Sequence, residues 1–263
     1  MEWYYYLVIA LFAVAVILFL LYSNNKIKVS KYQILSDKIS EKGVKIAHIS
    51  DLHGKCFLKD NSYLINNIKK QSPTHICITG DIIHNYNPRG VSVAKSLIKE
   101  CVKIAPVLFV CGNHELRYLG YEAFKKSLQS LGATVLDDKA VCLDGVTFYG
   151  VSDSNLREEN LKKPDKNSFT VLLAHEPQYF KCFCQLGYNL ALCGHAHGGQ
   201  WRIPFTSIGL YAPGQGIFPK YTSGRHSMGA TDMIISRGLG NSSFPIRLFN
   251  TPELVVIQIN KAK

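Results

Sequence analysis

The sequence predicts an α/β domain that follows one membrane-spanning helix. Two observations lead to this prediction. Residues 3–22 form an uncharged apolar run, and the rest of the chain alternates short apolar segments rich in β-branched residues with helical stretches, as in βαβ units. We therefore divide the chain into a transmembrane anchor over residues 1–25, a short basic tether and lead-in over 26–43, and an α/β domain over 44–263.

The apolar run is long enough to cross a hydrocarbon core about 30 Å thick, and aromatic residues stand at both of its ends. A cleavable signal peptide is the alternative. The sequence disfavours a signal peptide, because no positive n-region precedes the apolar run and no small-residue cleavage site stands before Lys26. Glu2 precedes the run, whereas Lys26, Lys28 and Lys31 follow it. The positive-inside rule then predicts a single-pass membrane protein with its domain in the cytoplasm.

Short apolar runs predict the strands of the domain. Five of them are expected to be parallel strands, at residues 44–50, 75–79, 107–111, 169–174 and 189–193, and two later ones, at 231–235 and 254–259, are expected to belong to a second sheet. Helices are expected at 61–70, 92–103 and 121–131. Parallel strands separated by helices deliver their carboxyl ends to one rim of a sheet.

Each of the first five runs ends at a cluster of polar residues. The clusters are Asp51-Leu52-His53, Gly80-Asp81, Gly112-Asn113-His114-Glu115, Ala174-His175-Glu176 and Gly194-His195-Ala196-His197. If the strand ends meet at one rim, these side chains converge there. Aspartate oxygens and neutral imidazoles suit zinc, iron and manganese, and two-metal sites hold their ions about 3.5–4 Å apart. The pattern predicts a two-metal hydrolytic centre.

Taken singly, these residues have simpler explanations. Asp51, Asp81 and Asn113 are residue types that also cap helices or form turns, and the glycines also mark tight turns. His175 and His195 follow apolar strands and fit hydrogen-bonded core histidines. It is the joint occurrence of all five clusters that favours a metal centre.

The five clusters, in this order, resemble those of the calcineurin-like metallophosphoesterases. The resemblance covers roughly residues 44–259 and is nearest to the membrane-anchored bacterial branch, because of Gly198-Gly199-Gln200, Ser236-Arg237-Gly238-Leu239-Gly240 and Pro245-Ile246-Arg247-Leu248-Phe249. It implies a metallophosphoesterase-type sandwich of two mixed β-sheets flanked by helices.

The resemblance also implies a role for each site residue. One divalent ion is held by Asp51, His53 and His197, the other by Asn113, His175 and His195, with Asp81 bridging both and His114 catalytic rather than a ligand. The two ions, whose identity stays open among manganese, iron and zinc, would activate a bridging hydroxide that attacks phosphorus directly. Asn113 ligates without adding negative charge that would repel a phosphate.

His84 departs from the family pattern. Relatives commonly carry an aspartate three residues after the aspartate of the Gly-Asp motif, and here a histidine stands in its place. That aspartate often supports the metal ligands through hydrogen bonds. The substitution leaves all seven expected ligands in place but leaves metal preference open.

These observations predict a membrane-tethered, dinuclear metal-dependent phosphoric ester hydrolase that cleaves a phosphodiester or pyrophosphate bond. The membrane location suggests a lipid-linked substrate, and a nucleotide-linked one remains open. Two alternatives are an enzyme like the UDP-2,3-diacylglucosamine pyrophosphatase of lipid A synthesis and a non-catalytic, metal-stabilised scaffold at the membrane.

Composition narrows the remaining possibilities. The formal net charge of +11 comes largely from scattered lysines, without a recognition motif or a dense basic run, so no nucleic acid partner is expected. The eight cysteines do not have the spacing of a zinc knuckle or a thioredoxin-like pair, and a reduced compartment is the simpler account. The irregular stretch 201–228 holds Trp201, Phe205, Tyr211 and Phe218, which could form an apolar pocket wall near the membrane or pack beneath the domain.

Overall fold

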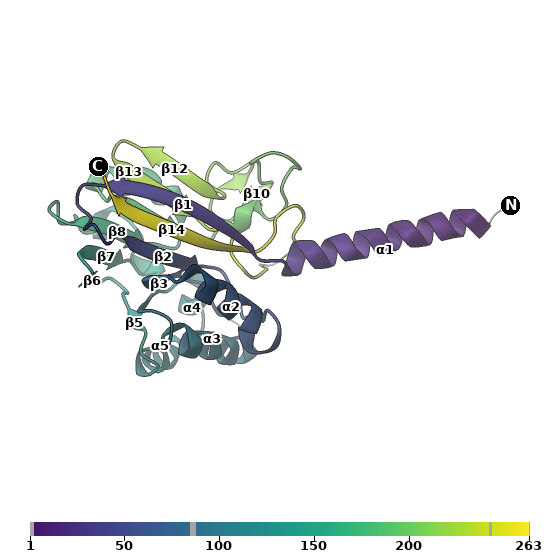
Figure 1. Ribbon diagram of the computed structural model, residues 1–263, viewed down its shortest axis with the longest axis horizontal. Helices are drawn as coiled ribbons and strands as arrows, with labels where there is room; N and C mark the ends of the chain where they lie inside the picture. The colour runs from purple at the N-terminus through teal and green to yellow at the C-terminus, as the bar shows by residue number, and fades with distance from the viewer. Residues whose placement is uncertain (1–2, 85–87, 242–243, 263) are drawn as a thin grey trace.

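Two six-stranded β-sheets lie face to face in this protein, helices cover their outer sides, and one long helix projects from the domain (Figure 1). The computed structural model describes residues 3–84, 88–241 and 244–262. The projecting helix is α1 (Trp3–Asn25), and the domain begins three residues after it with β1 (Lys28–Ser36).

The first sheet has the strand order β1-β14-β2-β3-β4-β5. Its remaining strands are β2 (Val44–Ile49), β3 (His75–Thr79), β4 (Val107–Val110), β5 (Thr134–Val135) and β14 (Glu253–Lys261). Strands β2 to β5 are parallel neighbours, β14 is antiparallel to β2, and β1 pairs in parallel with β14 from Lys28↔Glu253 to Ser36↔Lys261. The sheet is therefore mixed.

The second sheet has the order β12-β13-β9-β8-β7-β6. These strands are β6 (Ala140–Leu143), β7 (Val146–Gly150), β8 (Phe169–Leu173), β9 (Leu190–Cys193), β12 (Gly224–Met228) and β13 (Thr231–Ile235). The four central strands are parallel and both edge strands are antiparallel. A separate two-stranded ladder joins β10 (Tyr211–Ala212) to β11 (Gly216–Ile217).

The helices bury one apolar face each. They are α2 (Ser62–Gln71), α3 (Pro88–Cys101), α4 (Asn113–Leu116), α5 (Tyr121–Ser130) and α6 (Phe180–Leu186), and short 3₁₀ turns lie at Lys59–Asn61, Asp153–Asn155, Glu158–Asn160, Pro177–Tyr179 and His197–Gly199. In α3 the buried residues Ala94, Leu97, Ile98 and Cys101 recur every three or four positions, which places them on one side of the helix.

Three apolar cores hold these layers together. Between the sheets, Ile46 and Leu108 of the first sheet share a core with Phe148 and Val171 of the second. A second core joins the first sheet to α2, α3 and α5, and a third packs α6 against the second sheet. The parallel strands are buried on both faces, as expected of strands covered by layers on both sides.

The predicted fold class is confirmed. Two mixed sheets flanked by helices follow an apolar amino-terminal helix, and the expected strands and helices form within a few residues of their expected bounds. The segment expected to be a tether differs, because residues 28–36 form β1. Its two lysines, Lys28 and Lys31, are exposed on this edge strand, where charged side chains remain solvated.

The helix α1 is long and apolar enough to cross a membrane, by length and composition. Ser23 is its one buried residue among those described, so α1 is not a core helix of the domain. A signal sequence near the amino terminus would meet the same criteria of length and composition.

Candidate metal centre

Five strands position the expected site residues at one end of the sandwich. Asp51 and His53 follow β2, Asp81 follows β3, and Asn113 and His114 open α4 directly after β4. His175 follows β8 of the second sheet, and His195 and His197 follow β9. The site therefore lies where the carboxyl ends of parallel strands from both sheets meet, as in other open α/β sheets.

Three groups of side chains come close enough to hold a metal ion. They are Asp51 with His53 and His197, Asp81 with His175 and His195, and His53 with Asp81 and His114, and in each group the ligand atoms lie within 4.8 Å of one another. Asp81 belongs to two groups, so its carboxylate stands between the others. The structure thus brings together six of the seven expected ligands and the expected catalytic histidine.

The first group is fixed by Asp51. Its carboxylate accepts hydrogen bonds from the His195 backbone N–H at 3.0 and 3.1 Å and lies 3.4 Å from Nε2 of His197. Nε2 of His197 lies only 3.0 Å from Nε2 of His53. The two rings thus direct ring nitrogens at one point beside a carboxylate.

The second group is centred on Asp81. Oδ2 of Asp81 lies 3.1 Å from Nε2 of His175, and that nitrogen is in turn 3.1 Å from Nδ1 of His195. Oδ1 of Asp81 accepts the backbone N–H of His114 at 2.8 Å, which leaves Oδ2 facing the imidazoles. His114 itself approaches this oxygen to 4.0 Å through Nε2.

Asn113 and His114 line the cavity above these groups. The cavity has a volume of about 430 Å³ and is also lined by Asp81, Arg117, Asp153, Glu176, His195, His197, Gln200, Tyr211, Pro213, Gly214 and Phe244. Oδ1 of Asn113 is buried and has no hydrogen-bond partner among the residues that the structure describes. An unpartnered buried oxygen of this kind is available to a cation.

The tautomer of His175 fits a metal ligand. Its Nδ1 lies 2.7 Å from the carbonyl oxygen of Thr79, which can only accept, so Nδ1 carries the proton. Nε2 of the ring then faces the Asp81 carboxylate and Nδ1 of His195, at a position where either a proton or a metal ion can bind. A backbone carbonyl behind the ring is the usual support of a metal-binding histidine.

The electrostatics of the site point the same way. Burial lowers the pKa of His53 and His195 to about 3 and that of His197 well below its ordinary value, so these imidazoles stay neutral and can ligate. Burial acts against a charged His175, but Asp81 outweighs it and raises the pKa of this imidazole well above its ordinary value. Positive charge is therefore favoured at the centre of the cluster.

Backbone conformation is unusual throughout the site. Five of the expected ligands have positive φ angles, namely Asp51 (52°), His53 (49°), Asp81 (52°), His195 (64°) and His197 (47°). Such conformations cost about 1–3 kcal/mol each and cluster at functional sites. Gly112 and Gly194 leave the space that the two carboxylates fill, because a Cβ at either position would collide with Asp81 or Asp51.

Several residues support the site through contacts that the sequence did not predict. Glu115 is fully buried and accepts the backbone N–H groups of Asp81 (2.7 Å), Ile83 (3.0 Å) and Gly112 (2.9 Å). Asn250 donates to the carbonyl oxygens of His197 (2.7 Å) and Gln200 (2.9 Å). The position of Glu115 beside His114 is the one indication that the sequence offers for this pair.

Arg247 and Arg117 were also not predicted. Arg247 is 1% exposed and donates to the carbonyl oxygens of Gly240 (3.0 Å, through Nε) and Arg237 (2.9 Å), in the loop that covers Asp51. Arg117 lines the cavity one turn after His114, which places a cation where an anionic substrate would enter. Neither arginine belongs to a cluster that ends a predicted strand.

His84 remains part of the site despite its departure from the family pattern. Its ring lies 4.9 Å from the ring of His114 and 5.9 Å from that of His53, measured between centroids. The residue that stands in place of the usual aspartate is therefore a neighbour of the expected catalytic histidine.

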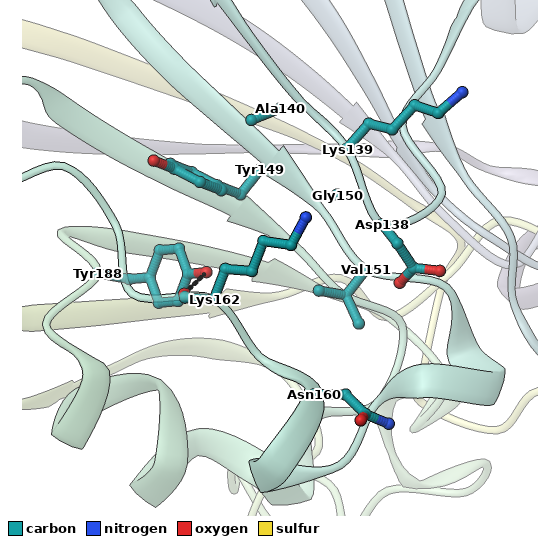
Figure 2. Close-up of a pocket in the computed structure, with 9 residues that line it drawn as sticks. All are labelled: Asp138, Lys139, Ala140, Tyr149, Gly150, Val151, Asn160, Lys162 and Tyr188. Atoms are coloured by element: carbon teal, nitrogen blue, oxygen red, sulfur yellow. Dashed lines mark hydrogen bonds between the residues drawn. The ribbon is translucent and has the colours of Figure 1, made fainter.

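A second, much smaller hollow lies away from these groups (Figure 2). It has a volume of about 60 Å³ and is lined by Asp138, Lys139, Ala140, Tyr149, Gly150, Val151, Asn160, Lys162 and Tyr188. The Tyr188 hydroxyl closes one side by donating to the carbonyl oxygen of Lys162 at 2.6 Å. None of the expected ligands lines it, so the candidate site is the larger cavity.

Comparison with known proteins places this geometry in a family. The family model described as calcineurin-like phosphoesterase matches residues 44–199, which include all seven expected ligands and His114. The chain belongs to the calcineurin-like phosphoesterases. It is accordingly a metal-dependent hydrolase of phosphoric esters.

Two bacterial relatives extend the match beyond those residues. The chain is 30% identical over 231 residues to the uncharacterized metallophosphoesterase YkuE of Bacillus subtilis, covering 82% of this chain and 79% of YkuE. It is 28% identical over 226 residues to the phosphodiesterase YaeI of Escherichia coli, covering 82% of each chain. The crystal structure of TT1561 of Thermus thermophilus has the same fold, with a TM-score of 0.51 at 10% identity over 75% of this chain and 90% of TT1561.

Proposed function

We propose that this calcineurin-like phosphoesterase is held at a membrane by α1 and hydrolyses phosphodiester or pyrophosphate bonds with two divalent metal ions. Asp51, His53 and His197 would hold one ion, Asn113, His175 and His195 the other, and Asp81 would contact both. The observation that supports this assignment best is the position of the Asp81 carboxylate, which groups with His175 and His195 on one side and with His53 on the other.

The metals, when bound, polarise the phosphoryl group and supply a nucleophile at neutral pH. Oxygen and imidazole donors of this kind suit manganese, iron or zinc. Asp51 and Asp81 neutralise half of the four positive charges that two divalent ions bring, and Asn113 neutralises none. The surplus charge, with Arg117 at the cavity wall, favours an anionic phosphoryl group.

We assign the catalytic role to His114. Its side chain is 18% exposed, more than the other site imidazoles that approach Asp81, and it opens into the cavity beside Asn113. From there an imidazole can donate a hydrogen bond or a proton to the oxygen that leaves phosphorus. The backbone N–H of His114 donates to Asp81 at 2.8 Å, which fixes the backbone of His114 beside the ligand groups.

The test uses the full chain purified in detergent. We expect about two metal ions per chain and hydrolysis of bis(p-nitrophenyl) phosphate with manganese, lost in Asp81→Ala together with the metal. His114→Ala should keep its metal and lose about 10²–10⁴-fold in turnover. His226→Ala, whose ring packs against Tyr221, is the matched control. Wild-type activity that survives chelation would contradict the mechanism, and two bound ions without hydrolysis would favour the scaffold.

The anchor and its orientation are tested separately. We expect the full chain to remain in membranes during detergent-free fractionation and to resist extraction with carbonate. Because lysines follow α1, the domain should lie in the cytoplasm, where the exposed thiols of Cys56 and Cys142 react with an impermeant maleimide only after cells are permeabilised. A soluble, shortened product would instead identify α1 as a cleaved signal sequence.

A further inference from the structure

We propose that the catalytic domain docks directly onto the bilayer through an apolar collar around the end of α1. The collar consists of Leu58, Ile203, Phe205 and Phe249. This inference rests on the proposed function, in that α1 must cross the membrane. It goes further, because a lipid surface then becomes a binding partner of the domain itself.

The collar residues are large apolar side chains that the fold leaves in solvent. Their exposed fractions are 71% for Leu58, 39% for Ile203, 109% for Phe205 and 50% for Phe249. They come from three loops far apart in sequence, one before α2, one after the His195/His197 cluster and one before β14. A clustered apolar surface built from separate loops is typical of a contact with a membrane or a partner.

The collar lies beside the last turns of α1, which projects from the domain (Figure 1). The Phe249 ring lies 5.0 Å from the Phe19 ring of α1, centroid to centroid. Phe205 and Ile203 line a hollow of about 330 Å³ together with Phe19 and Tyr22. Leu58 lines another hollow, of about 410 Å³, with Tyr22 and Leu21.

The joint between α1 and the domain is held by hydrogen bonds. Asn24 accepts the backbone N–H of Arg247 at 2.9 Å and donates to its carbonyl oxygen at 3.3 Å, and Lys55 donates to the carbonyl oxygen of Asn24. Ser23 is buried at the junction. A helix end fixed in this way holds the collar at one depth relative to α1.

That depth is the membrane interface. Residues 3–22 span about 30 Å at 1.5 Å per residue, so a bilayer centred on this run places Tyr22 at the boundary of its hydrocarbon core and Phe19 about 5 Å inside that boundary. Side chains that touch Phe19 lie at the same level. The collar is therefore in the layer where amphipathic surface elements bind lipid.

Backbone conformation gives independent support. Leu58 (φ 61°), Phe205 (φ 62°) and Phe249 (φ 52°) all lie in the left-handed region, which is costly for residues with a Cβ. Largely exposed side chains return little packing energy to the domain to offset that cost. Burial of these side chains in lipid would offset it, at about 1.5–3 kcal/mol each.

The collar also adjoins the candidate active site. Trp201 lies in the same loop as Phe205, and its ring is 5.8 Å from that of Phe244, which lines the metal cavity. Docking would therefore hold the cavity beside the lipid surface. An amphiphile whose acyl chains stay in the bilayer could then present its phosphoester to the site.

The chain carries its own probe for this contact. Trp3 and Trp201 are its two tryptophans, so full-length Trp3→Phe reports on Trp201 alone. We would reconstitute it in vesicles of phosphatidylcholine and phosphatidylglycerol brominated near the acyl carbonyl. Emission should fall roughly two-fold, because interfacial rings lie about 5–10 Å into the headgroup and acyl boundary. Phe205→Ser with Phe249→Ser should remove most of that quenching.

The matched control is Leu35→Ser. Leu35 is 68% exposed on β1, about 23 Å of strand beyond Lys28, so quenching of Trp201 should be unchanged. A chain that floats with the vesicles but is quenched by aqueous acrylamide and not by bromine would overturn the collar and leave the anchor standing. Protection from both quenchers would mean that protein covers the surface, which also overturns it. If the chain does not float with the vesicles, both the anchor and the collar are contradicted.

Discussion

Asn113 is the one neutral oxygen donor among the expected ligands. Its Oδ1 is buried and lacks a partner among the described residues, whereas Asp51 and Asp81 both accept backbone N–H groups. A carboxylate in place of the amide would bind a cation at least as well. Its disadvantage would lie in the substrate, since it adds a negative charge where an anion must bind.

Asn113→Asp should therefore raise the KM for an aryl phosphodiester about ten-fold, or about 1.4 kcal/mol, while metal content stays the same. Steady-state kinetics and elemental analysis on the full chain measure both. Asn167→Asp adds the same charge on an exposed loop and serves as the control. An unchanged KM would show that the charge of residue 113 plays no part in substrate binding.

His48 provides a pH-dependent contribution to stability outside the metal ligands. It is fully buried in β2, its Nε2 contacts Oγ1 of Thr79 at 2.8 Å, and burial lowers its pKa from 6.5 to about 3. The folded state therefore keeps the ring neutral where the unfolded chain would protonate it. The contribution of His48 to the free energy of unfolding is fully present above pH 6.5 and is lost as the pH falls toward 3.

At pH 5 this difference amounts to about 2 kcal/mol from His48 alone. We expect the free energy of unfolding of His48→Leu to fall less than that of the wild type between pH 7.5 and pH 5, measured by denaturant titration. The comparison uses the slope with pH, so a constant loss of packing in the variant does not affect it. Parallel slopes would assign the acid sensitivity to other groups.

The expected ligands could be found from the sequence because each follows an apolar run directly. Asp51, Asp81 and Asn113 stand within two or three residues of a strand end, and so does His195. Glu115 lies in one of these clusters, but its role could not be found in this way, and Arg247 follows no predicted strand. Their importance comes from backbone groups that they bind, and those groups become neighbours only after folding.

At the level of elements, the site depends on how the loops after β3 and β4 are tied together. Glu115, in α4 after β4, accepts backbone N–H groups from Asp81 and Ile83 after β3 and from Gly112 of its own loop. One buried carboxylate thus fixes two loops and the conformation of Asp81. Burial raises the pKa of Glu115 to about 7, and Asp81 adds to that rise.

Glu115→Ala would leave three buried N–H groups without an acceptor. We expect a loss of about 3 kcal/mol in unfolding free energy or more, and weaker metal binding, because Asp81 loses its support. Glu115→Gln keeps one acceptor oxygen, so its unfolding free energy should lie between that of the wild type and that of Glu115→Ala. Glu100→Ala, which removes an exposed ion pair with Lys103, should cost less than about 1 kcal/mol. Equal losses of unfolding free energy in Glu115→Ala and Glu100→Ala would show that Glu115 does not hold the two loops together.

Sequence periodicity predicted the buried elements better than the edge elements. Strands β3, β8 and β9 are fully buried and read as continuous apolar runs. Edge strands β1 and β12 carry lysine, arginine or serine at partly exposed positions, so their sequences resemble loops. They form strands because they pair with β14 and β13, and their own composition does not predict that pairing.

For the whole molecule, the collar makes substrate access depend on the membrane. A phosphoester embedded in vesicles reaches the cavity only if the domain sits on the lipid surface, whereas a soluble aryl phosphodiester does not need that contact. Phe205→Ser should lower the rate on the embedded substrate about ten-fold, the equivalent of about 1.4 kcal/mol of lost burial. The rate on the soluble substrate should stay the same.

Both rates are measured on one preparation of full-length protein in vesicles, with Leu35→Ser as the control. Equal losses on the two substrates would mean that Phe205 affects the site itself rather than access to it.

The pairing of β1 with β14 sets the order in which this molecule can be completed. β14 inserts between β1 and β2, and Lys28 pairs with Glu253, which the ribosome adds 225 residues later. At about 5–20 residues per second, that interval lasts roughly 10–45 s. If α1 has already entered the bilayer, the nascent chain waits there with the edges of β1 and β2 unpaired, where they are open to pairing with another chain.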